Sequence, residues 1–382
     1  MHFTSVLASA LAATLVAGHP GHDHAAEALE RRQIMSMMER KDLSHCAAKI
    51  KARGLEARSI ARRNAAASKL LKRGNLLNGR DLPTLLNTTH HSCKSYNLNT
   101  PETTIFATNS SCILSPEVTE GPYYVAGEYI RENVVESEPG LPLHLDIQVL
   151  DMETCEPVTG AFLEIWHCNS TGVYSGVSAN GNGNGAASNL NNTFLRGVQL
   201  TDADGVSQFD TLFPGHYTGR ATHIHVMVHL NATARANGTV MDTTASHVGQ
   251  FFFDQDLIAE VESLPVYVDN KQPLTLNADD NILADAAQTS DPFLQYVTLG
   301  SAVSDGLLGW IAFGINSTLA RAVTQGATLY AEGGVTNEHA GGPGGGPGGP
   351  GGPPPGFPTG GFPGGPRPTS SAAPSATPLP RV

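Results

Sequence analysis

Short apolar–polar alternations separated by turn residues fill the middle of the chain, and they constrain the fold more than any other feature. The segments 144–151 (HLDIQVLD) and 221–230 (ATHIHVMVHL) alternate as half-buried strands do. Pro-Gly and Asp-Gly turn signals lie between the apolar segments. Further strands are predicted over 161–167, 194–200, 206–213, 247–253 and 266–268. This pattern predicts a mainly β, antiparallel-rich sandwich.

The two ends of the chain differ from this middle part. Residues 1–18 contain an apolar run followed by small residues, which predicts a secretory signal peptide. The run is too short for a membrane span, which takes about 20 apolar residues. Residues 336–382 are rich in Gly, Pro and Ser, a composition that favours a disordered tail. The globular domain is therefore predicted over 95–335.

The segment 19–94 differs from the globular domain in both composition and charge. It is rich in Ala, Leu, Arg and Lys, which favours helix. Residues 1–90 hold 14 Lys/Arg against 7 Asp/Glu, whereas residues 91–340 hold 7 against 28. Dibasic pairs such as Arg62-Arg63 fit a propeptide that is cut, a helical arm for self-association, or a solvated helix without a specific task. The acidic middle part argues against nucleic acid or an anionic membrane as its partner.

Sequons and cysteines favour export from the cell. None of the five cysteines has CxxC spacing, which argues against a zinc knuckle or a thioredoxin-like site. In an oxidising compartment they fit two disulfides and one odd thiol. N-x-Ser/Thr sequons begin at Asn87, Asn109, Asn169, Asn191, Asn231, Asn237 and Asn316. We therefore predict an extracellular, secreted glycoprotein.

A histidine pair in one predicted strand indicates where the chemistry lies. His223 and His225 are two residues apart, so both side chains point to the same face of the strand. The pair suits a metal ion, although alone it also fits two surface histidines. His229 shares that face but lies roughly 13 Å beyond His225 at about 3.3 Å per residue, too far for the same ion. Two tyrosines, Tyr217 and Tyr174, lie nearby in the sequence. Their presence favours a metal site over two surface histidines.

Several ordered motifs around these residues resemble the intradiol ring-cleavage dioxygenases, which are the catechol, hydroxyquinol and protocatechuate dioxygenases. The stretch 194–226 (FLRGVQLTDADGVSQFDTLFPGHYTGRATHIHV) resembles the signature of the family. The stretches 119–124 (TEGPYY), 160–175 (GAFLEIWHCNSTGVYS) and 250–256 (QFFFDQD) resemble its motifs upstream and downstream. The resemblance covers about residues 112–260 and is to the extracellular, fungal-like branch.

The resemblance implies a role for each matching residue. Arg220 matches the arginine that faces the bound substrate, and Gln250 matches a glutamine near the cleavage site. Four residues match the ligands of a non-heme Fe(III) cofactor: Tyr174, Tyr217, His223 and His225. This set is chemically reasonable because Fe(III) is a hard ion that prefers anionic oxygen. A bound trivalent ion would remove the proton from a phenol whose ordinary pKa is about 10.

The implied reaction inserts both atoms of O2 into a catechol-type aromatic diol and gives a muconate-type diacid. In it Tyr217 would take a proton from the diol, and Arg220 would stabilise the negative charge that develops on the ring. The implied partners are a small aromatic diol and O2, with no nucleic acid and no membrane span. Members of the family often form dimers, so a homodimer is among the expected assemblies.

Two other classes of protein fit part of the sequence. A secreted β-sandwich module could bind a metal or a carbohydrate without catalysis, but no ligand of the proposed set is missing from this chain. A cupin-like enzyme would use His223 and His225 with a downstream carboxylate and another histidine, which leaves Tyr174 and Tyr217 unexplained. Colour separates these classes, because a ferric tyrosinate protein is burgundy.

Overall fold

The structure is a computed structural model, and it describes residue 29 and residues 43–73, 120–179, 181–287 and 291–337. Several sequence predictions lie outside the described residues: the signal peptide, Cys93 and Cys112, the sequons at Asn87 and Asn109, and the tail beyond residue 337.

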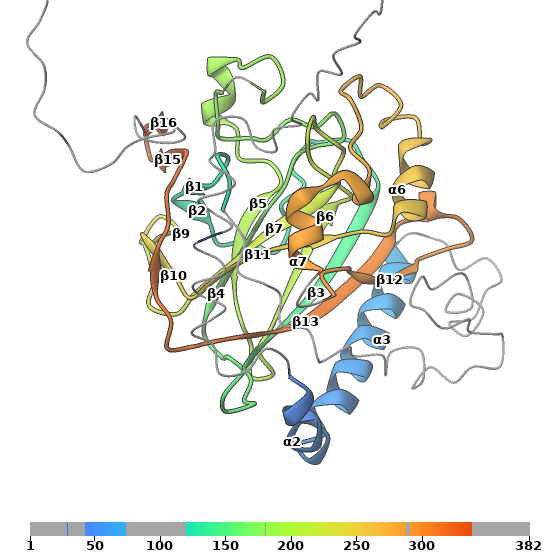
Figure 1. Cartoon of the computed structure of the whole chain (residues 1–382), viewed down its shortest axis with the longest axis vertical. Helices are drawn as coiled ribbons and strands as arrows, with labels where there is room; N and C mark the ends of the chain where they lie inside the picture. The colour runs from blue at the N-terminus through green and yellow to red at the C-terminus, as the bar shows by residue number, and fades with distance from the viewer. Residues whose placement is uncertain (1–28, 30–42, 74–119, 180, 288–290, 338–382) are drawn as a thin grey trace, which may run out of the picture. The chain divides into compact units, whose positions relative to one another are not determined.

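Two four-stranded sheets form the domain (Figure 1). The first sheet is antiparallel throughout and has the order β11 (His247–Phe252), β7 (His223–His229), β4 (Phe162–Trp166) and β5 (Arg196–Leu200). The second has the order β12 (Gln295–Thr298), β13 (Leu307–Ile315), β3 (Pro142–Asp151) and β6 (Val206–Leu212). Only its pair of β13 and β3 is parallel. The predicted mainly β, antiparallel-rich sandwich is confirmed.

The main core lies between these two sheets, and strand alternation builds it. Every second residue of each strand faces inward, so one apolar cluster joins β3 and β7. Its members from these two strands are Leu145, Ile147, Val149, Ile224, Val226 and Val228. Burying one such side chain contributes about 1.5–3 kcal/mol. The intervening residues of β7, His223 and His225 among them, therefore face away from this core.

Short elements surround the sandwich. The short strands are β1 (Val125–Ala126), β2 (Glu128–Tyr129), β8 (Thr233–Ala234), β9 (Thr239–Met241), β10 (Thr244–Ala245), β14 (Arg321–Ala322), β15 (Ala327–Tyr330) and β16 (Gly333–Thr336). The helices are η1 (Ser44–Cys46), α2 (Ala47–Ala52), α3 (Leu55–Arg73), η2 (Ala187–Asn191), α6 (Gln255–Glu262), η3 (Asn277–Asp279), α7 (Asn281–Ala286) and η4 (Val303–Asp305). The helices α2 and α3 confirm the predicted helical N-terminal segment.

The strand predicted over 266–268 is wrong. Helix α6 ends at Glu262, and the chain continues as turns in which the amide of Tyr267 donates to the carbonyl of Leu264. The apolar residues of this segment still reach the core, and the hydroxyl of the buried Tyr267 donates to the carbonyl of Phe213 at 2.7 Å. Its hydrophobicity therefore reflects burial in turns rather than extended pairing.

Helix α3 packs on the outer face of the second sheet, as Figure 1 shows beside β13 and β3. Ala67 lies in one apolar cluster with residues of β12 and β13, and Ile60 and Leu70 pack against it. Arg63 is fully buried there, and its guanidinium carbon lies 5.2 Å from the centre of the Trp310 ring. One residue of the predicted dibasic pair is thus part of a packed interface.

Ion pairs join the basic N-terminal helices to the acidic domain. Asp146 of β3 pairs with Arg62 at 2.7 Å and with Arg63 at 3.3 Å. Near the surface, Arg58 pairs with Asp204 at 2.8 Å. The opposite charges of the two segments, which are visible in the sequence, are therefore partly paired with each other in the fold.

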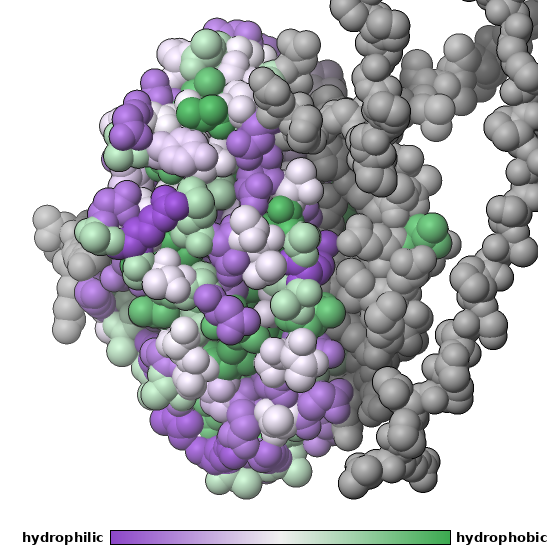
Figure 2. Space-filling view, turned by 90° about the vertical axis from the view of Figure 1, so that its left-hand side faces the viewer, coloured by the Kyte–Doolittle hydropathy of each residue, from purple (hydrophilic) through white to green (hydrophobic). Residues whose placement is uncertain are grey.

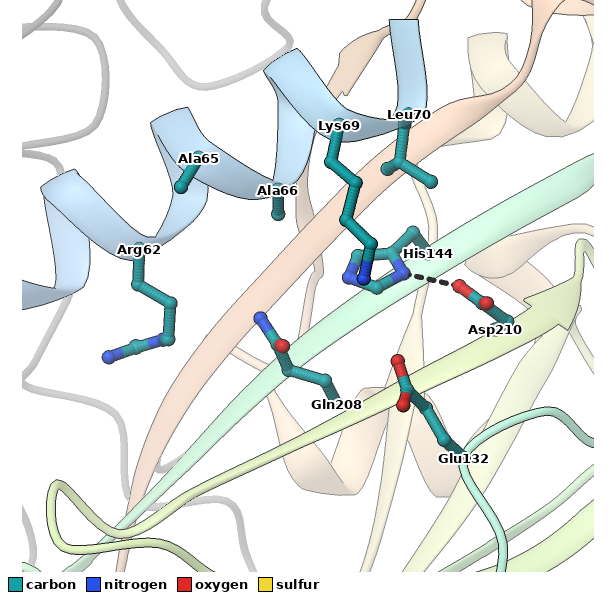
Figure 3. A pocket seen from close by; sticks show the side chains of 9 residues that line it. All are labelled: Arg62, Ala65, Ala66, Lys69, Leu70, Glu132, His144, Gln208 and Asp210. Carbon is teal, nitrogen blue, oxygen red and sulfur yellow. Dashed lines mark hydrogen bonds and ion pairs between the residues drawn. The ribbon is translucent and has the colours of Figure 1, made fainter. Parts of the chain in front are cut away.

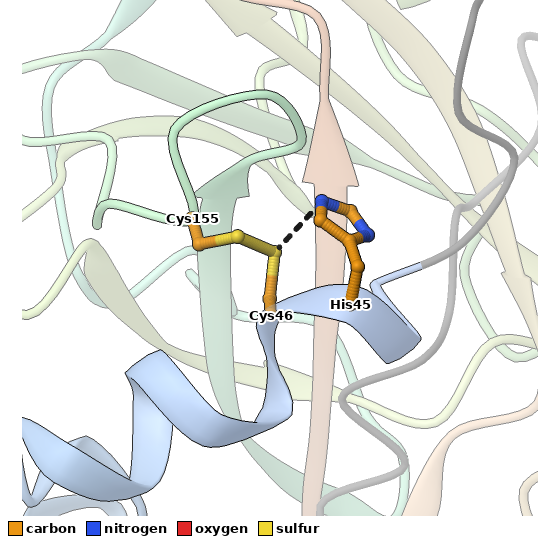
Figure 4. Close-up of side chains that lie close together, drawn as sticks. All are labelled: His45, Cys46 and Cys155. Carbon is orange, nitrogen blue, oxygen red and sulfur yellow. Dashed lines mark hydrogen bonds between the residues drawn. A yellow bond between two sulfur atoms is a disulfide. The ribbon is translucent and has the colours of Figure 1, made fainter.

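A disulfide joins Cys46 to Cys155, 109 residues further along the chain (Figure 4). In the chain-entropy account, a loop of about 100 residues closed in this way stabilises the folded state by up to about 4.7 kcal/mol. Cys168 is free and buried, and its thiol donates to the carbonyl of Gly215. The described residues thus hold one of the two predicted disulfides. A cut between Arg62 and Arg63 would leave the preceding piece tethered through Cys46.

A cavity of about 220 Å³ lies between α3 and the strands β3 and β6 (Figure 3). Lys69 and Leu70 of the helix face it from one side. From the sheet come His144 and Asp210, whose Nδ1 and Oδ1 atoms are 2.6 Å apart. The cavity belongs to the outer face of the second sheet, whereas His223 and His225 belong to the first sheet, so the two regions are separate.

The described helices include none that is long and apolar enough to cross a membrane. On the face of the molecule that Figure 2 shows, hydrophobic and hydrophilic residues are interspersed among the described residues. The described part of that face therefore carries no broad apolar patch.

Candidate metal centre

Two phenols and two imidazoles converge on the outer side of the first sheet. His223 Nε2 lies 3.1 Å from His225 Nε2, 3.4 Å from Tyr217 Oη and 3.5 Å from Tyr174 Oη. The rings of Tyr174 and Tyr217 meet edge-on, with centroids 5.4 Å apart. None of the four side chains is more than 2% exposed. The structure thus brings together all four residues that the sequence predicted as metal ligands.

Local structure explains how these side chains reach one another. His223 and His225 alternate with core residues of β7, so their rings share its outer face. Trp166 lies opposite His225 in the neighbouring strand β4, and its ring stacks on the imidazole at 4.7 Å with an interplanar angle of 7°. Trp166 therefore fixes the plane of the His225 ring.

Tyr217 reaches the same point through a tight turn that precedes β7. Tyr217 and Arg220 form an isolated bridge, and Gly219 between them has φ +87°, which a residue with a side chain rarely adopts. The turn returns the phenol to the start of the strand, where its ring centre is 5.6 Å from that of His223.

Burial keeps Tyr174, Tyr217 and His223 uncharged in the metal-free protein. Burial, and then the charge of Arg220, lower the pKa of His223 to about 3. The Nδ1 atom of His223 donates to the carbonyl of Ala221 at 2.6 Å, which leaves a lone pair on Nε2. Burial raises the pKa of Tyr174 well above its ordinary value, and it also raises the pKa of Tyr217. A bound cation is therefore needed to convert either phenol to a phenolate at neutral pH.

The donor set fits a hard trivalent ion. With metal–nitrogen bonds of about 2.1 Å, neighbouring ligand atoms around one ion lie roughly 3 Å apart, as the donor atoms around His223 Nε2 do. Two phenolates would offset most of the charge of Fe(III), and two neutral imidazoles complete the set. The usual non-heme Fe(II) triad has two histidines and one carboxylate instead. The residues that would hold a ferric ion are Tyr174, Tyr217, His223 and His225.

Arg220 and Gln250, both predicted site residues, lie together beside the candidate ligands. Gln250 of β11 is paired with His225 across the sheet. Arg220 Nη2 donates to Gln250 Oε1 at 2.5 Å, and Arg220 Nε donates to Asp280 Oδ2 at 2.9 Å. Burial acts to lower the pKa of Arg220, but the charge of Asp280 raises it above its ordinary value. The structure thus supplies a permanent positive charge next to the four candidate ligands.

Asp280 is the residue of this site that sequence reasoning missed. Besides Arg220, it accepts from the amide of Ala221 at 2.7 Å and from the amide of Leu283 at 2.8 Å. The second contact caps helix α7. In sequence, an Asp before a short helix indicates an N-cap, and nothing there points to an arginine 60 residues earlier.

Asp280→Asn is expected to lower the free energy of unfolding by about 1.5–3 kcal/mol, because the hydrogen bond to Arg220 loses its charged acceptor. Asparagine still caps a helix well, so α7 itself should remain. Urea unfolding of the variant and of the wild type measures the difference. Asp279→Asn is the matched control, since Asp279 is the exposed neighbour in the chain. Equal losses in both variants would contradict this role of Asp280.

Two other histidines near the site, His167 and His229, have structural contacts. His167 bonds to the hydroxyl of Thr211 and to the carbonyl of Cys168. His229 bonds to Glu164 and to the carbonyl of Thr244, so it is engaged away from the four candidate ligands. These side chains stabilise loops and strands around the site.

Comparisons with known proteins place the similarity on this same stretch. A family model described as "Dioxygenase" matches residues 119–258, which include all six predicted site residues. Catechol 1,2-dioxygenase 1 of Acinetobacter lwoffii is 33% identical over 137 residues, or 30% of this chain. These residues amount to 42% of that protein, so the chain spans less than half the length of this curated relative.

Solved structures similar to the chain include the following two. An intradiol ring-cleavage dioxygenase from Tetranychus urticae is 33% identical, and the match covers 54% of this chain and 95% of that one, with a TM-score of 0.44. The dioxygenase domain of a dioxygenase carbohydrate-binding protein fusion from Streptomyces sp. SirexAA-E is 25% identical. That match covers 55% of this chain and 99% of the domain, with a TM-score of 0.34.

Proposed function

The chain belongs to the intradiol ring-cleavage dioxygenase family through residues 119–258, and on this premise we propose that it opens the ring of a catechol-type diol with O2. The product would be a muconate-type diacid. One observation carries the proposal: two phenols and two imidazoles surround one point, with a buried arginine beside them. A non-catalytic binding module has no evident use for that arginine.

The proposed cofactor is a non-heme Fe(III) held by Tyr174, Tyr217, His223 and His225. When bound, ferric iron supplies the Lewis acidity that makes a bound diol ring reactive toward O2. The chain supplies the surroundings, because the ligands and the adjacent Arg220 are almost completely buried and water is largely excluded. Electrostatic interactions inside such a site are stronger than in water.

Tyr217 is proposed to accept a proton from the diol, and Arg220 is proposed to stabilise the negative charge that develops on the ring. The Oη atom of Tyr217, once a phenolate, can accept a proton from a diol hydroxyl. We assign this role to Tyr217, which lies in a four-residue turn with Arg220. Arg220 is held by Asp280 and Gln250, so its positive charge is fixed before negative charge develops on the ring.

Oxygen uptake by the full chain tests the proposal. The purified protein is loaded with Fe(III), its visible spectrum is recorded, and O2 consumption is followed with catechol, hydroxyquinol, protocatechuate and lignin-derived diols. We expect a burgundy protein that consumes one O2 per diol. A colourless iron-loaded protein would exclude the ferric tyrosinate centre, and a coloured protein that uses no O2 with any diol would favour the binding module.

The protein is also proposed to be exported and glycosylated. The disulfide between Cys46 and Cys155 supports this, since such bonds persist in oxidising compartments. Asn191, Asn231 and Asn237 are exposed. Asn169 differs, because its amide nitrogen donates to Glu138 at 2.8 Å. Mass spectrometry of glycopeptides from exported protein should find glycans at exposed sequons and none at Asn169.

The homodimer stays a prediction, and light scattering of the purified chain measures its mass directly.

A further inference from the structure

Tyr174, unlike the two histidines, has no strand to hold it. It follows β4 and lies in an irregular segment that turns at Ser175 and Gly176. A metal ligand outside regular structure needs other contacts to fix its backbone, because each free backbone residue costs about 1–2 kcal/mol to order. The structure shows which side chains provide those contacts.

Asn182 binds both backbone groups of Tyr174. Its Oδ1 atom accepts from the amide of Tyr174 at 2.7 Å, and its Nδ2 atom donates to the carbonyl of the same residue at 2.8 Å. Nδ2 also donates to the carbonyl of Val177 at 2.9 Å. Asn182 is 2% exposed although it comes from a stretch of alternating Asn and Gly residues. This amide therefore holds Tyr174 from both sides.

Asn189 and Arg196 extend the same arrangement. The Nδ2 atom of Asn189 also donates to the carbonyl of Tyr174, and to that of Val177 at 2.8 Å. Arg196 of β5 is fully buried, and its Nη2 atom donates to the carbonyl of Ser175 at 2.7 Å. Its guanidinium carbon lies 5.9 Å from the centre of the Tyr174 ring. Together the three side chains donate to the carbonyls of Tyr174, Ser175 and Val177.

We propose that Asn182, Asn189 and Arg196 form a clamp that positions Tyr174 as a ligand before iron binds. The inference rests on the proposed function, since it assigns positioning residues for the same ferric site. The buried carbonyls of Tyr174 and Val177 each receive two side-chain donors, which is more than a loop needs for satisfaction alone. The Asn/Gly-rich stretch, which has the composition of a linker, thus serves the metal centre.

Asn182→Ala in the full chain tests the clamp through iron affinity and amide exchange. Removing Asn182 takes away the acceptor of the Tyr174 amide, so hydrogen exchange at that amide should become at least tenfold faster in the metal-free protein. Ferric affinity, followed by the visible band during titration with Fe(III), should fall at least tenfold. Asn184→Ala is the matched control. Asn184 is exposed, lies in the same loop, and its Oδ1 atom accepts from the backbone amide of Ala186.

Asn182→Asp separates the two halves of the contact. Aspartate keeps the acceptor for the Tyr174 amide and loses both donors, so slow exchange should return while ferric affinity stays low. If Asn182→Ala does not fold, Asn182→Asp provides the test of the clamp. Wild-type ferric affinity in both Asn182 variants would overturn the clamp alone. Absence of ferric binding by the wild type would overturn the proposed function, and the ligand role of the clamp with it.

Discussion

His223→Ala is expected to abolish ferric iron binding, and with it the visible absorption and O2 uptake. The Nε2 atom of His223 lies at the centre of the proposed site, within 3.5 Å of a side-chain O or N atom of each of the other three proposed ligands. Substituting even an outer contact of a metal ligand typically costs 10- to 100-fold in affinity or activity, so loss of the ligand itself should exceed about 100-fold. Iron per chain, measured by mass spectrometry, checks this.

The two tyrosines should respond differently from each other. Tyr174→Phe should lose iron almost as His223→Ala does, because the backbone of Tyr174 is held rigidly against the site. Tyr217→Phe should keep part of its iron and bind the diol slowly, since the proposed role of Tyr217 is to take a proton from the diol. Tyr330→Phe, at a half-exposed tyrosine that is not one of the four candidate ligands, is the control. Equal iron loss at every ligand would contradict this division of roles.

The strands that carry the histidines could be predicted from sequence because one physical rule fixes them. Alternation in a strand places His223 and His225 on one face whatever the rest of the chain does. The family resemblance then supplied Tyr174 and Tyr217, whose positions depend on turns that no periodicity describes. The failed strand at 266–268 shows the limit of the rule, since burial in turns gives the same hydrophobic signal as a short strand.

Residues whose role depends on a distant contact could not be predicted, because their sequence signals have a commoner meaning. The sequence around Asp280 indicates a helix cap, and the structure shows that Asp280 is one. Its hydrogen bond to Arg220 joins residues 60 positions apart. Asn182 reads as part of a flexible stretch rich in Asn and Gly. In sequence, Arg63 belongs to a dibasic pair typical of a solvated helix, yet it is fully buried in the structure. In each case the partner is distant in sequence, and only the fold brings it near.

Asp146→Ala is expected to destabilise the domain by about 3–5 kcal/mol, since it removes one partner of a buried ion pair. Asp146 is fully buried and accepts from Arg62 at 2.7 Å and from Gln208 at 3.0 Å. The fully buried Arg63 would lose this carboxylate as its ion-pair partner and keep its charge. Urea unfolding measures the loss. Asp204→Ala is the control, because the exposed pair of Asp204 with Arg58 should contribute only about 0–1 kcal/mol.

Acid should reproduce part of this effect in the wild type. Burial raises the pKa of Asp146, but the hydrogen bond from Arg62 and the charge of Arg63 together lower it below the ordinary 3.8. A carboxyl whose pKa is lower in the folded state stabilises the protein above the unfolded-state pKa, and this contribution is lost as the pH falls below about 3.8. The Asp146→Ala variant should therefore lose less stability between pH 5 and pH 3 than the wild type does. Asp146 faces α3 from the second sheet, so folded Asp146→Ala protein should still bind ferric iron. Loss of iron from the folded variant would show that the helical segment and the proposed metal centre are coupled.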